Sequence, residues 1–369
     1  MQGLPPIKLS CTSCGRPYPE GSHPHTCPYC GGVYDLSTPL IYDPDLVALD
    51  DRSLWRYRHT FPLPLEATPV TLGEGGTALL ADEIAGRKVY FKLEYLNPTG
   101  SFKDRGTTLL VSWLKAHGIR EAVEDSSGNA GASFAAYAAR AGIRARIFIP
   151  DYASGPKRAQ IEAYGAEVSK IPGPRSAASE AVLKAADNGA VYASHNYSPV
   201  GLAGLATAAY EIVDQLGRAP ETVVLPVGHG SFAVGLHRGF KALAAAGVIQ
   251  NLPRIVAVQA LPCAPLWAAV TGGPQGLQWV TEGQTVAEGI RILRPVRGDA
   301  VLSAVNESRG TVLAFDDEAI LEGRRQLARR GLYVEPTSAV VWPALLQIAQ
   351  HFKGDIVVLL TGSGHKTGN

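Results

Sequence analysis

The chain has 369 residues, of which 46% are hydrophobic and 18% are charged, so it can bury a sizeable core in two or three domains. Its formal net charge is +1 and no block of like charge occurs, which gives no sign of a nucleic-acid or membrane partner. No run of about 18 apolar residues and no apolar leader is present. We therefore expect a cytoplasmic protein that acts on small molecules.

Four of the five cysteines form a repeated C-x-x-C-G-x-x-Y pattern, CTSCGRPY and CPYCGGVY, within residues 11–34. Two residues between the sulfurs let a tight turn aim both thiolates at one point. The glycine after the second cysteine permits the left-handed backbone that closes the turn. Two such turns predict a structural zinc ribbon over residues 1–38, with Zn²⁺ bound by the thiolates of Cys11, Cys14, Cys27 and Cys30.

The same cysteines have two other interpretations. Two disulfides would require an oxidising compartment, and a redox dithiol would require one C-x-x-C on an α/β scaffold rather than two in a loop-rich segment. His23 and His25 lie between the two cysteine pairs. We interpret them as solvated loop residues, with the replacement of one cysteine ligand by a histidine as the alternative.

The remainder of the chain follows a Pro-rich, aromatic segment (39–70) that is typical of a packed arm. Continuous runs of β-branched apolar residues predict strands buried on both faces, as in parallel sheets, over 89–94, 145–150, 190–194, 222–227, 254–260 and 355–360. Helices are predicted between them, over 103–117, 130–141, 156–165, 200–216, 232–246, 317–330 and 337–352. This alternation predicts an α/β protein, whose ligands should lie beyond the carboxyl ends of the strands.

The stretch NPTGSFKDRG (97–106) places Lys103 in the first turn of a predicted helix, after a turn made by Pro98 and Gly100. The positive end of a helix disfavours a cation, so it favours the neutral amine at this position. A lysine with a destabilised ammonium is a nucleophile toward carbonyl groups, as Schiff-base chemistry requires. An ordinary solvated lysine is the alternative.

Two further stretches open predicted helices with small residues. In SSGNAG (126–131), backbone N–H groups suit a carboxylate, and Asn129 offers an amide to a ring hydroxyl or an oxyanion. In LPVGHGS (225–231), a strand ends in Gly-His-Gly-Ser before a helix, which suits a phosphate. Ordinary capped turns would look the same, and we interpret His229 as a loop side chain rather than a general base.

A fourth stretch, VVLLTGSGHK (357–366), ends a predicted buried strand close to Thr361. A hydroxyl at that place is able to contact a heterocycle nitrogen. Taken alone, the pattern is equally typical of a strand end followed by a turn.

Together and in this order, these stretches resemble the threonine synthase family of the tryptophan-synthase-β-like (fold type II) pyridoxal-phosphate enzymes. VTLGEGGTAL (70–79), TVAEGIRI (285–292) and VEPTSAV (334–340) extend the resemblance, which covers the chain from about residue 66 to its end. A four-cysteine ribbon followed by SLWRYR (53–58) is also similar to one group of microbial members.

The resemblance implies two open, mostly parallel α/β domains with the cofactor in the cleft between them, and a homodimer. A zinc ribbon and an arm would precede these domains. The implied ranges are 1–38 for the ribbon, 39–75 for the arm, 76–108 with 201–369 for the large cofactor-binding domain, and 109–200 for the small domain.

The resemblance also implies roles for single residues. Lys103 would form the Schiff base with pyridoxal phosphate, Asn129 would hydrogen-bond the 3′-oxygen of the cofactor, and Thr361 would face its pyridine nitrogen. The cofactor phosphate would lie at the run Val227, Gly228, His229, Gly230 and Ser231. The substrate's α-carboxylate would be received by Ser126, Ser127 and Asn129.

The implied reaction converts O-phospho-L-homoserine and water to L-threonine and phosphate, with Lys103 as both anchor and base. A neutral hydroxyl at Thr361 does not keep the pyridine nitrogen protonated, which favours elimination and replacement over transamination. A β-eliminating or β-replacing lyase of the threonine or serine dehydratase type is the alternative. A catalytically idle relative is a third, which the intact Lys103, Asn129 and Thr361 argue against.

One departure from the family bears on the substrate. Many members have an arginine and a lysine before a Thr-Ala-Ala-aromatic-Glu helix, where this chain has Gly201 and Ala206. A dianionic leaving group needs charged or multiple donors. Either the substrate has no phosphate, or another residue compensates, with Lys157, Arg158 and Arg291 as candidates.

Overall fold

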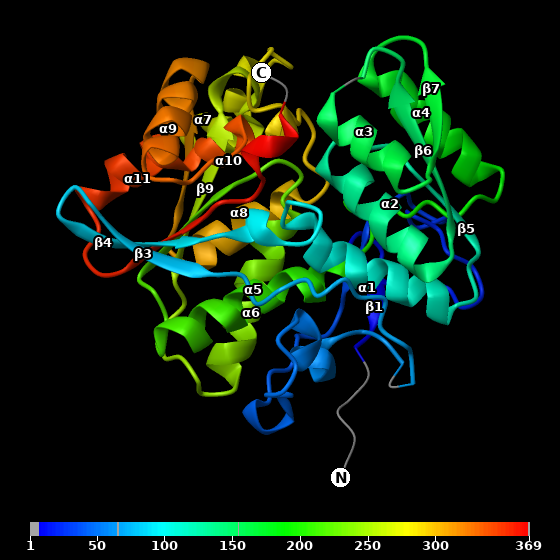
Figure 1. The fold of residues 1–369 in the computed structure, drawn as a ribbon, viewed down its shortest axis with the longest axis horizontal. Coiled ribbons are helices and arrows are strands. Elements are labelled where there is room, and N and C mark those ends of the chain that lie inside the picture. The colour runs from blue at the N-terminus through cyan, green and yellow to red at the C-terminus, as the bar shows by residue number, and fades with distance from the viewer. Residues whose placement is uncertain (1–6, 65, 154, 368–369) are drawn as a thin grey trace.

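The structure is a computed structural model that describes residues 7–64, 66–153 and 155–367, so the first six residues of the expected ribbon lie outside it. A six-stranded sheet has the strand order β10-β9-β8-β11-β4-β3, and a three-stranded sheet has the order β5-β6-β7 (Figure 1). The first comprises β3 (Leu79–Ile84), β4 (Arg87–Lys92), β8 (Thr222–Pro226), β9 (Arg254–Ala260), β10 (Thr311–Phe315) and β11 (Ile356–Leu359). The second comprises β5 (Glu121–Glu124), β6 (Arg144–Pro150) and β7 (Glu167–Ile171).

The strands of both sheets pair in parallel, except for the β3–β4 hairpin. Strands β8, β9 and β11 are buried along almost their whole length, as their continuous apolar runs predict. The predicted α/β class with two mostly parallel domains is thus confirmed. The predicted domain boundaries agree with this division of strands between two sheets, and they stay a prediction.

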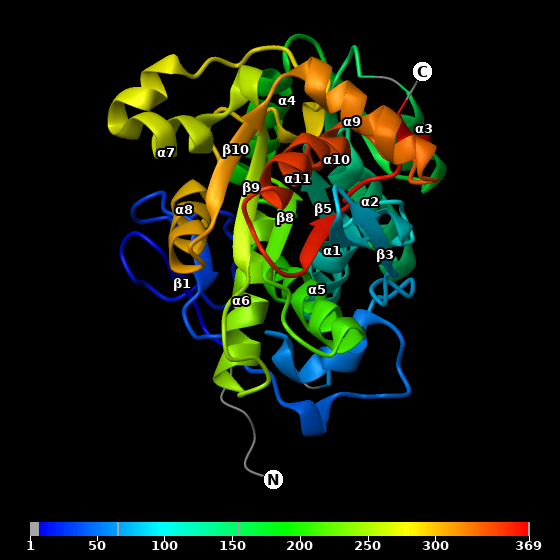
Figure 2. The same cartoon turned by 90° about the vertical axis from the view of Figure 1, so that its left-hand side faces the viewer.

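Helices cover both sheets, and Figure 1 shows two lobes side by side: a large lobe with the six-stranded sheet and a small lobe with the three-stranded sheet. Figure 2 shows the large lobe from its side. Helix α1 packs against α2 on one side and α5 on the other. The helices are α1 (Lys103–Ala116), α2 (Asn129–Ala141), α3 (Pro156–Ala163), α4 (Arg175–Asp187), α5 (Gly201–Leu216), α6 (Ser231–Ala245), α7 (Pro265–Gly276), α8 (Gly298–Glu307), α9 (Asp317–Arg329), α10 (Pro336–Ala339) and α11 (Val341–Ala349).

Two predicted elements are wrong in detail. Residues 190–194 do not form a strand, because only Tyr192 makes a bridge, to Val123 of β5. The chain turns directly afterwards, where the Ser194 hydroxyl accepts hydrogen bonds from the backbone N–H groups of residues 196 and 197, so the ladder ends. The helix predicted over 337–352 is split into α10 and α11, because Pro343 has no N–H to donate to the carbonyl four residues earlier.

The cysteine repeat folds as two equivalent turns joined by the antiparallel strands β1 (Leu9–Cys11) and β2 (Tyr34–Leu36). Gly15 and Gly31 both have φ of 71°, which confirms the left-handed glycine predicted after each second cysteine. The four cysteine sulfurs all lie within 4.8 Å of one another. They therefore form one cluster, as the repeat predicts.

The two histidines between the cysteine pairs are loop residues, as predicted, but they are only partly solvated. The His23 ring lies 4.9 Å from the ring of Trp113, and the His25 ring lies 5.4 Å from that of Tyr192. Both histidines are half-buried against the small lobe. They pack the ribbon onto that lobe, and neither joins the cysteine cluster among the described residues.

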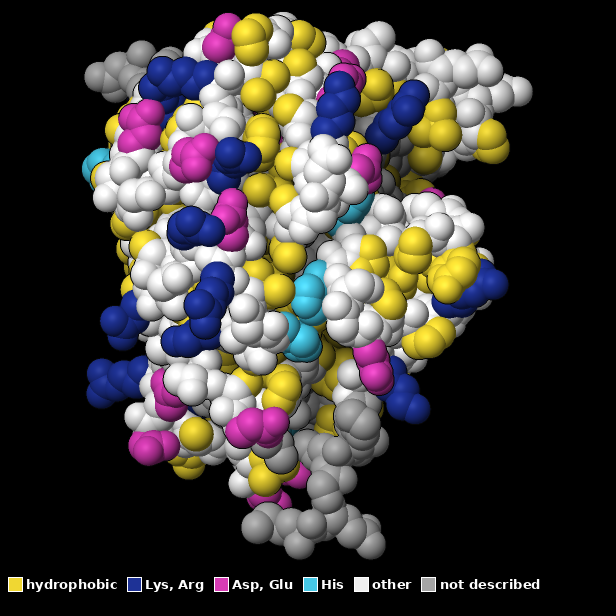
Figure 3. Space-filling view, turned by 90° about the vertical axis from the view of Figure 1, so that its right-hand side faces the viewer, with side chains coloured by type: hydrophobic (Ala, Val, Ile, Leu, Met, Phe, Trp, Pro, Cys, Tyr) yellow, Lys and Arg dark blue, Asp and Glu magenta, His cyan; other side chains and the backbone are white. Residues whose placement is uncertain are grey.

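The surface shows no broad region of a single charge on the face in Figure 3, where basic and acidic side chains are interspersed. Within residues 7–64, 66–153 and 155–367, no helix has the length and apolar character needed to cross a membrane. These observations agree with the charge pattern of the sequence.

Candidate active site

A cavity of about 670 Å³ lies between the two lobes and is lined by residues of both. The structure brings every residue predicted to contact cofactor or substrate to its wall: Lys103, Ser126, Ser127, Asn129, Val227, Gly228, His229, Gly230, Ser231 and Thr361. These residues come from four separate turns of the chain. Their convergence agrees with a single site at the carboxyl ends of the strands.

Lys103 is the first residue of α1, as the turn before it predicts. The N–H of Phe102 donates to the carbonyl oxygen of Thr361 at 3.0 Å, which ties the start of α1 to the end of the central strand β11. The Phe102 ring also stacks on the Phe232 ring, with centroids 4.6 Å apart, beside the start of α6. The lysine is thus fixed beside both the Thr361 turn and the 227–231 loop.

The environment of Lys103 favours a neutral amine. Burial lowers the pKa of Lys103 to about 8. The negative charge of Glu124 opposes this shift, and the positive charge of Arg175 adds to it. Asp104, directly after it, is fully buried and accepts hydrogen bonds from the Thr99 N–H and the Ser133 hydroxyl. The turn and helix that carry the lysine are therefore held rigidly against α2.

The loop between β8 and α6 has the backbone that a phosphate site requires. Gly230 has φ of +98°, and a Cβ on it would lie 2.4 Å from a methyl carbon of Val301, so only glycine fits. No side chain caps the first turn of α6, which leaves its N–H groups available to an anion. The backbone N–H of Arg297 donates to the His229 carbonyl at 3.1 Å, and the Arg297 guanidinium pairs with Asp35 of the ribbon.

Four buried side-chain oxygens of cavity-lining residues have no hydrogen-bond partner among the described residues: Asn129 Oδ1, Asn196 Oδ1, Ser231 Oγ and Thr361 Oγ1. Burying such atoms unpaired is costly, so each is expected to have a partner when the site is filled. A pyridine ring with a hydroxyl, a ring nitrogen and a phosphate offers partners to Asn129, Thr361 and Ser231 in that order. The residues present therefore fit pyridoxal phosphate.

The sequence did not reveal a buried pair beside Lys103. The ring Nδ1 of His195 lies 2.7 Å from Oε1 of Glu124, and His195 lines the cavity. Burial raises the pKa of Glu124 to about 7 and lowers that of His195 well below its ordinary value. Both shifts disfavour the charged histidine–carboxylate pair, and the contact holds the imidazole ring in place. When Glu124 is ionised, Nδ1 donates to it and Nε2 is an acceptor.

A second unforeseen group connects the lobes across the cavity. Glu335, on the large lobe, accepts a hydrogen bond from Asn129 Nδ2 at 2.9 Å and pairs with Lys157 Nζ at 2.8 Å. Glu335 lies in the VEPTSAV stretch, to which only the family resemblance, and no local pattern, drew attention. The contact also orients the Asn129 amide, whose oxygen is the one left without a partner among the described residues.

Comparisons with known proteins agree with this site. The chain matches the family described as "Pyridoxal-phosphate dependent enzyme" over residues 70–362. It is 36% identical to a threonine synthase of Methanosarcina acetivorans over 90% of this chain and 84% of that one, and 40% identical to a threonine synthase of Mycobacterium tuberculosis over 84% and 87%.

Solved structures share the fold. A maize serine racemase superposes with a TM-score of 0.67 at 24% identity, over 78% of this chain and 88% of that one. A T.th. threonine deaminase gives a TM-score of 0.67 at 25% identity, over 79% and 94%. The chain therefore belongs to the pyridoxal-phosphate dependent enzymes, within the threonine synthase family.

Proposed function

We propose that the protein converts O-phospho-L-homoserine and water to L-threonine and phosphate. The observation that carries the proposal is that one cavity brings together Lys103, whose pKa is lowered to about 8, and the buried oxygens of Asn129, Ser231 and Thr361, which have no partner among the described residues. The choice among reactions of the family is supported by relatives named threonine synthase at 36% and 40% identity over most of the chain.

In this proposal the cofactor is held by residues of both lobes. Asn129 Oδ1 lies at the ring hydroxyl, Thr361 Oγ1 faces the ring nitrogen, and Ser231 with the 227–230 backbone holds the phosphate. Bound pyridoxal phosphate withdraws electrons from Cα of the substrate and so acidifies its C–H bonds. Lys103 would bond to the cofactor, and its Nζ would also be the base for the α-proton of the substrate.

The turn that opens α2 receives the substrate's α-carboxylate in the same proposal. Ser126 and Ser127 line the cavity, and α2 begins at Asn129 without a side-chain cap. The N–H of Gly128 donates to the Ser126 hydroxyl, which holds the turn open. His195 Nε2 is placed to accept and return the proton that moves when water adds, because Glu124 fixes its ring.

Incubation with O-phospho-L-homoserine is expected to release phosphate and threonine in equal amounts, measured together in one reaction. A threonine or serine dehydratase type of lyase is the second candidate, favoured by the lack of cations at Gly201 and Ala206. It would instead form 2-oxobutyrate from threonine and release no phosphate from O-phospho-L-homoserine. That result would replace the first proposal by the second.

We further propose that the cysteine cluster binds one structural zinc ion. The sulfurs of Cys11 and Cys30 lie 3.5 Å apart, and those of Cys14 and Cys27 lie 3.7 Å apart. Four sulfurs at about 2.3 Å from a tetrahedral Zn²⁺ would be about 3.8 Å apart. A metal would also supply folding energy that so small a segment lacks.

Metal analysis of the purified protein is expected to find one zinc per chain. Cys11→Ser should lose it, because three thiolates no longer close the tetrahedron. Cys263→Ser is the matched control, since Cys263 is a buried cysteine outside the cluster and its loss should leave zinc unchanged. A folded wild-type protein without metal would contradict the proposal.

We also propose a homodimer in the cytoplasm and the domain ranges stated above, by likeness to the family. Thiolates free for zinc fit a reducing compartment, since the described cysteines form no disulfide. Light scattering on the purified protein tests the dimer, and a monomeric mass at micromolar concentration would count against it.

A further inference from the structure

Neither of the two positions that lack the family's cations lines the cavity. Gly201 lies at the start of α5, where a Cβ would approach the Gly106 carbonyl oxygen to 3.2 Å, because α1 and α5 are in backbone contact there. Ala206 is completely buried and does not line the cavity. A cation for an anionic substrate must come from elsewhere.

The cations suggested from the sequence are not available either. Arg158 pairs with Glu162. Neither Arg158 nor Arg291 lines the cavity. Lys157 lines the cavity but pairs with Glu335 at 2.8 Å. These three residues therefore do not provide a free positive charge at the site.

The cavity wall has three other cations besides Lys103 and Lys157, namely Arg175, Arg324 and Lys366. Lys366 donates to the Thr99 carbonyl at 2.6 Å, and the Arg324 guanidinium is engaged by three oxygens of its own lobe. Among the residues that the structure describes, Arg175 makes no hydrogen bond and no ion pair. It is the cavity cation whose donors remain available.

Arg175 is held at the turn that opens α2. It is the first residue of α4, and one turn later on the same face the Ser179 hydroxyl donates to Asp125 at 2.7 Å. Asp125 precedes the Ser126–Ser127 turn and also accepts from the Tyr192 hydroxyl at 2.6 Å. Helix α4 is thereby fixed beside this turn, with Arg175 at the wall of the cavity.

The charge of Arg175 is felt by the groups around the reacting atoms. Burial and the charge of Lys103 lower the pKa of His195, and the charge of Arg175 lowers it further. The charge of Arg175 also adds to the effect of burial in lowering the pKa of Lys103. The same charge works against the burial that raises the pKa of Glu124, so Arg175 acts on all three groups around the reacting atoms. Because Arg175 forms no ion pair with Glu124 or with any other described carboxylate, its donors stay available to a bound anion.

We propose that Arg175 binds the phosphate group of the substrate side chain. This inference rests on the proposed function and names the group that replaces the family's usual cations. A guanidinium binds a phosphate with two parallel hydrogen bonds. In the elimination the Cγ–O bond breaks, Cβ gives up a proton, and the bonding electron pair leaves with the phosphate oxygen, where a fixed cation stabilises the added charge. Water then adds its hydroxyl at Cβ and a proton at Cγ, so that the atoms balance.

The experiment uses the holoenzyme with Arg175→Gln and Arg175→Lys, and Arg158→Gln as the matched control of equal charge change. We expect Arg175→Gln to lower kcat/KM for O-phospho-L-homoserine by about 10- to 100-fold and to weaken inorganic phosphate binding, measured by calorimetry, to a similar degree. Arg175→Lys should recover part of both, and Arg158→Gln should change neither. Binding of L-2-aminobutyrate, which has no phosphate, should change less than about threefold, as should cofactor retention.

Other outcomes would overturn the inference in distinguishable ways. Equal weakening of L-2-aminobutyrate would assign Arg175 to the α-carboxylate, and loss of the cofactor would assign it to the cofactor phosphate. Unchanged kinetics and phosphate binding in Arg175→Gln would make it an ordinary surface cation. If the wild-type enzyme does not turn over O-phospho-L-homoserine but binds phosphate through Arg175, the proposed function fails and the anion site stands.

Discussion

Purified Lys103→Ala protein is expected to lack the visible absorbance of bound cofactor and to release phosphate from O-phospho-L-homoserine at least about a thousand-fold more slowly than the wild type. The alanine removes both the group that bonds to the cofactor and the base that takes the α-proton. Absorbance after dialysis and a phosphate assay measure the two losses. Lys115→Ala is the control, because Lys115 is exposed on the last turn of the same helix and should keep both properties.

The lowered pKa of Lys103 gives this prediction a pH dependence. The neutral amine is the reactive form, so the rate at which cofactor-free protein regains its absorbance should rise with pH, reach half of its plateau near pH 8 and level off above that. An ordinary lysine would let the rate rise to above about pH 10. A wild-type protein that stays colourless with added cofactor would remove the basis for assigning Lys103.

The parts of the fold that were predictable are those with a strong local pattern. The strand predicted over 254–260 is found with those bounds, and the helix predicted over 103–117 ends within one residue of its predicted end. Strands β3, β5, β7 and β10 of the two sheets were missed, because their burial alternates or is partial. The sequences of β3, β5 and β7 also carry charges, as in LLADEI. They are edge or short strands, whose pairing is set by neighbours far along the chain.

The site divides in a similar way. The turns around Lys103, Asn129 and Gly230 carry glycine and helix-start signals in consecutive residues, so sequence alone located them. Arg175 and His195 have no glycine or helix-start signal of this kind beside them. Their place in the site depends on how the two lobes pack around the cavity. Glu124 did leave a trace, since it is an acid at the end of the short strand β5, just before the Ser126 turn. A carboxylate at the carboxyl end of a strand, where ligands of a parallel sheet lie, is a signal of a functional site.

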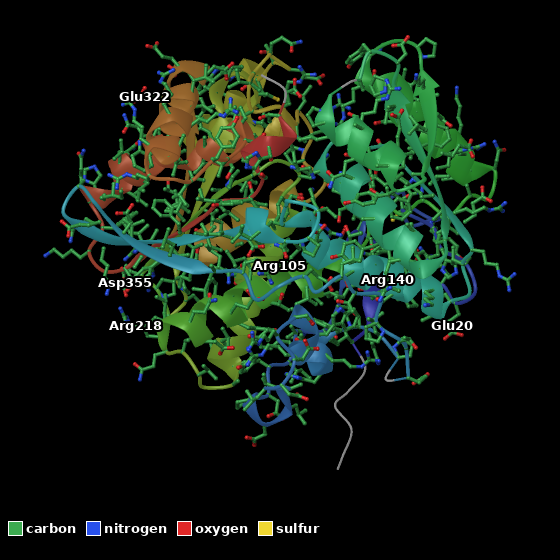
Figure 4. All side chains as sticks on the ribbon, viewed as in Figure 1. Glu20, Arg105, Arg140, Arg218, Glu322 and Asp355 are labelled. Carbon is green, nitrogen blue, oxygen red and sulfur yellow. The ribbon has the colours of Figure 1, made fainter. Side chains whose placement is uncertain are left out.

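Arg105, two residues after Lys103, belongs to a buried ion network that holds helix α1 in place. Arg105 is completely buried near the centre of the molecule (Figure 4). Its guanidinium donates to both oxygens of Glu94 and both oxygens of Glu211, at 2.6 to 2.7 Å. Lys92 Nζ pairs with Glu211 at 2.7 Å, so two cations balance two carboxylates.

The charges in this network depend on one another. Burial alone would raise the pKa of Glu211. The charges of Arg105 and Lys92 outweigh burial and hold this pKa well below its usual range. A carboxyl group with a depressed folded-state pKa stabilises the fold above its unfolded pKa of about 4.5, and this stability is lost as the pH falls below that value. At neutral pH both carboxylates are charged, and removing the guanidinium would leave them with Lys92 alone.

Arg105→Ala is therefore expected to lower the free energy of unfolding by about 3–5 kcal/mol, which is the usual cost of leaving a buried charge unpaired. The urea midpoint of the purified holoenzyme measures the loss. Arg140→Ala is the matched control, because Arg140 is exposed at the end of α2 (Figure 4), and it should change the free energy by less than about 0.5 kcal/mol. A loss below about 1 kcal/mol in Arg105→Ala would mean that the carboxylates take up protons instead. In that case the variant should lose stability as the pH rises from about 6 to about 8, since deprotonation would restore the unpaired charge.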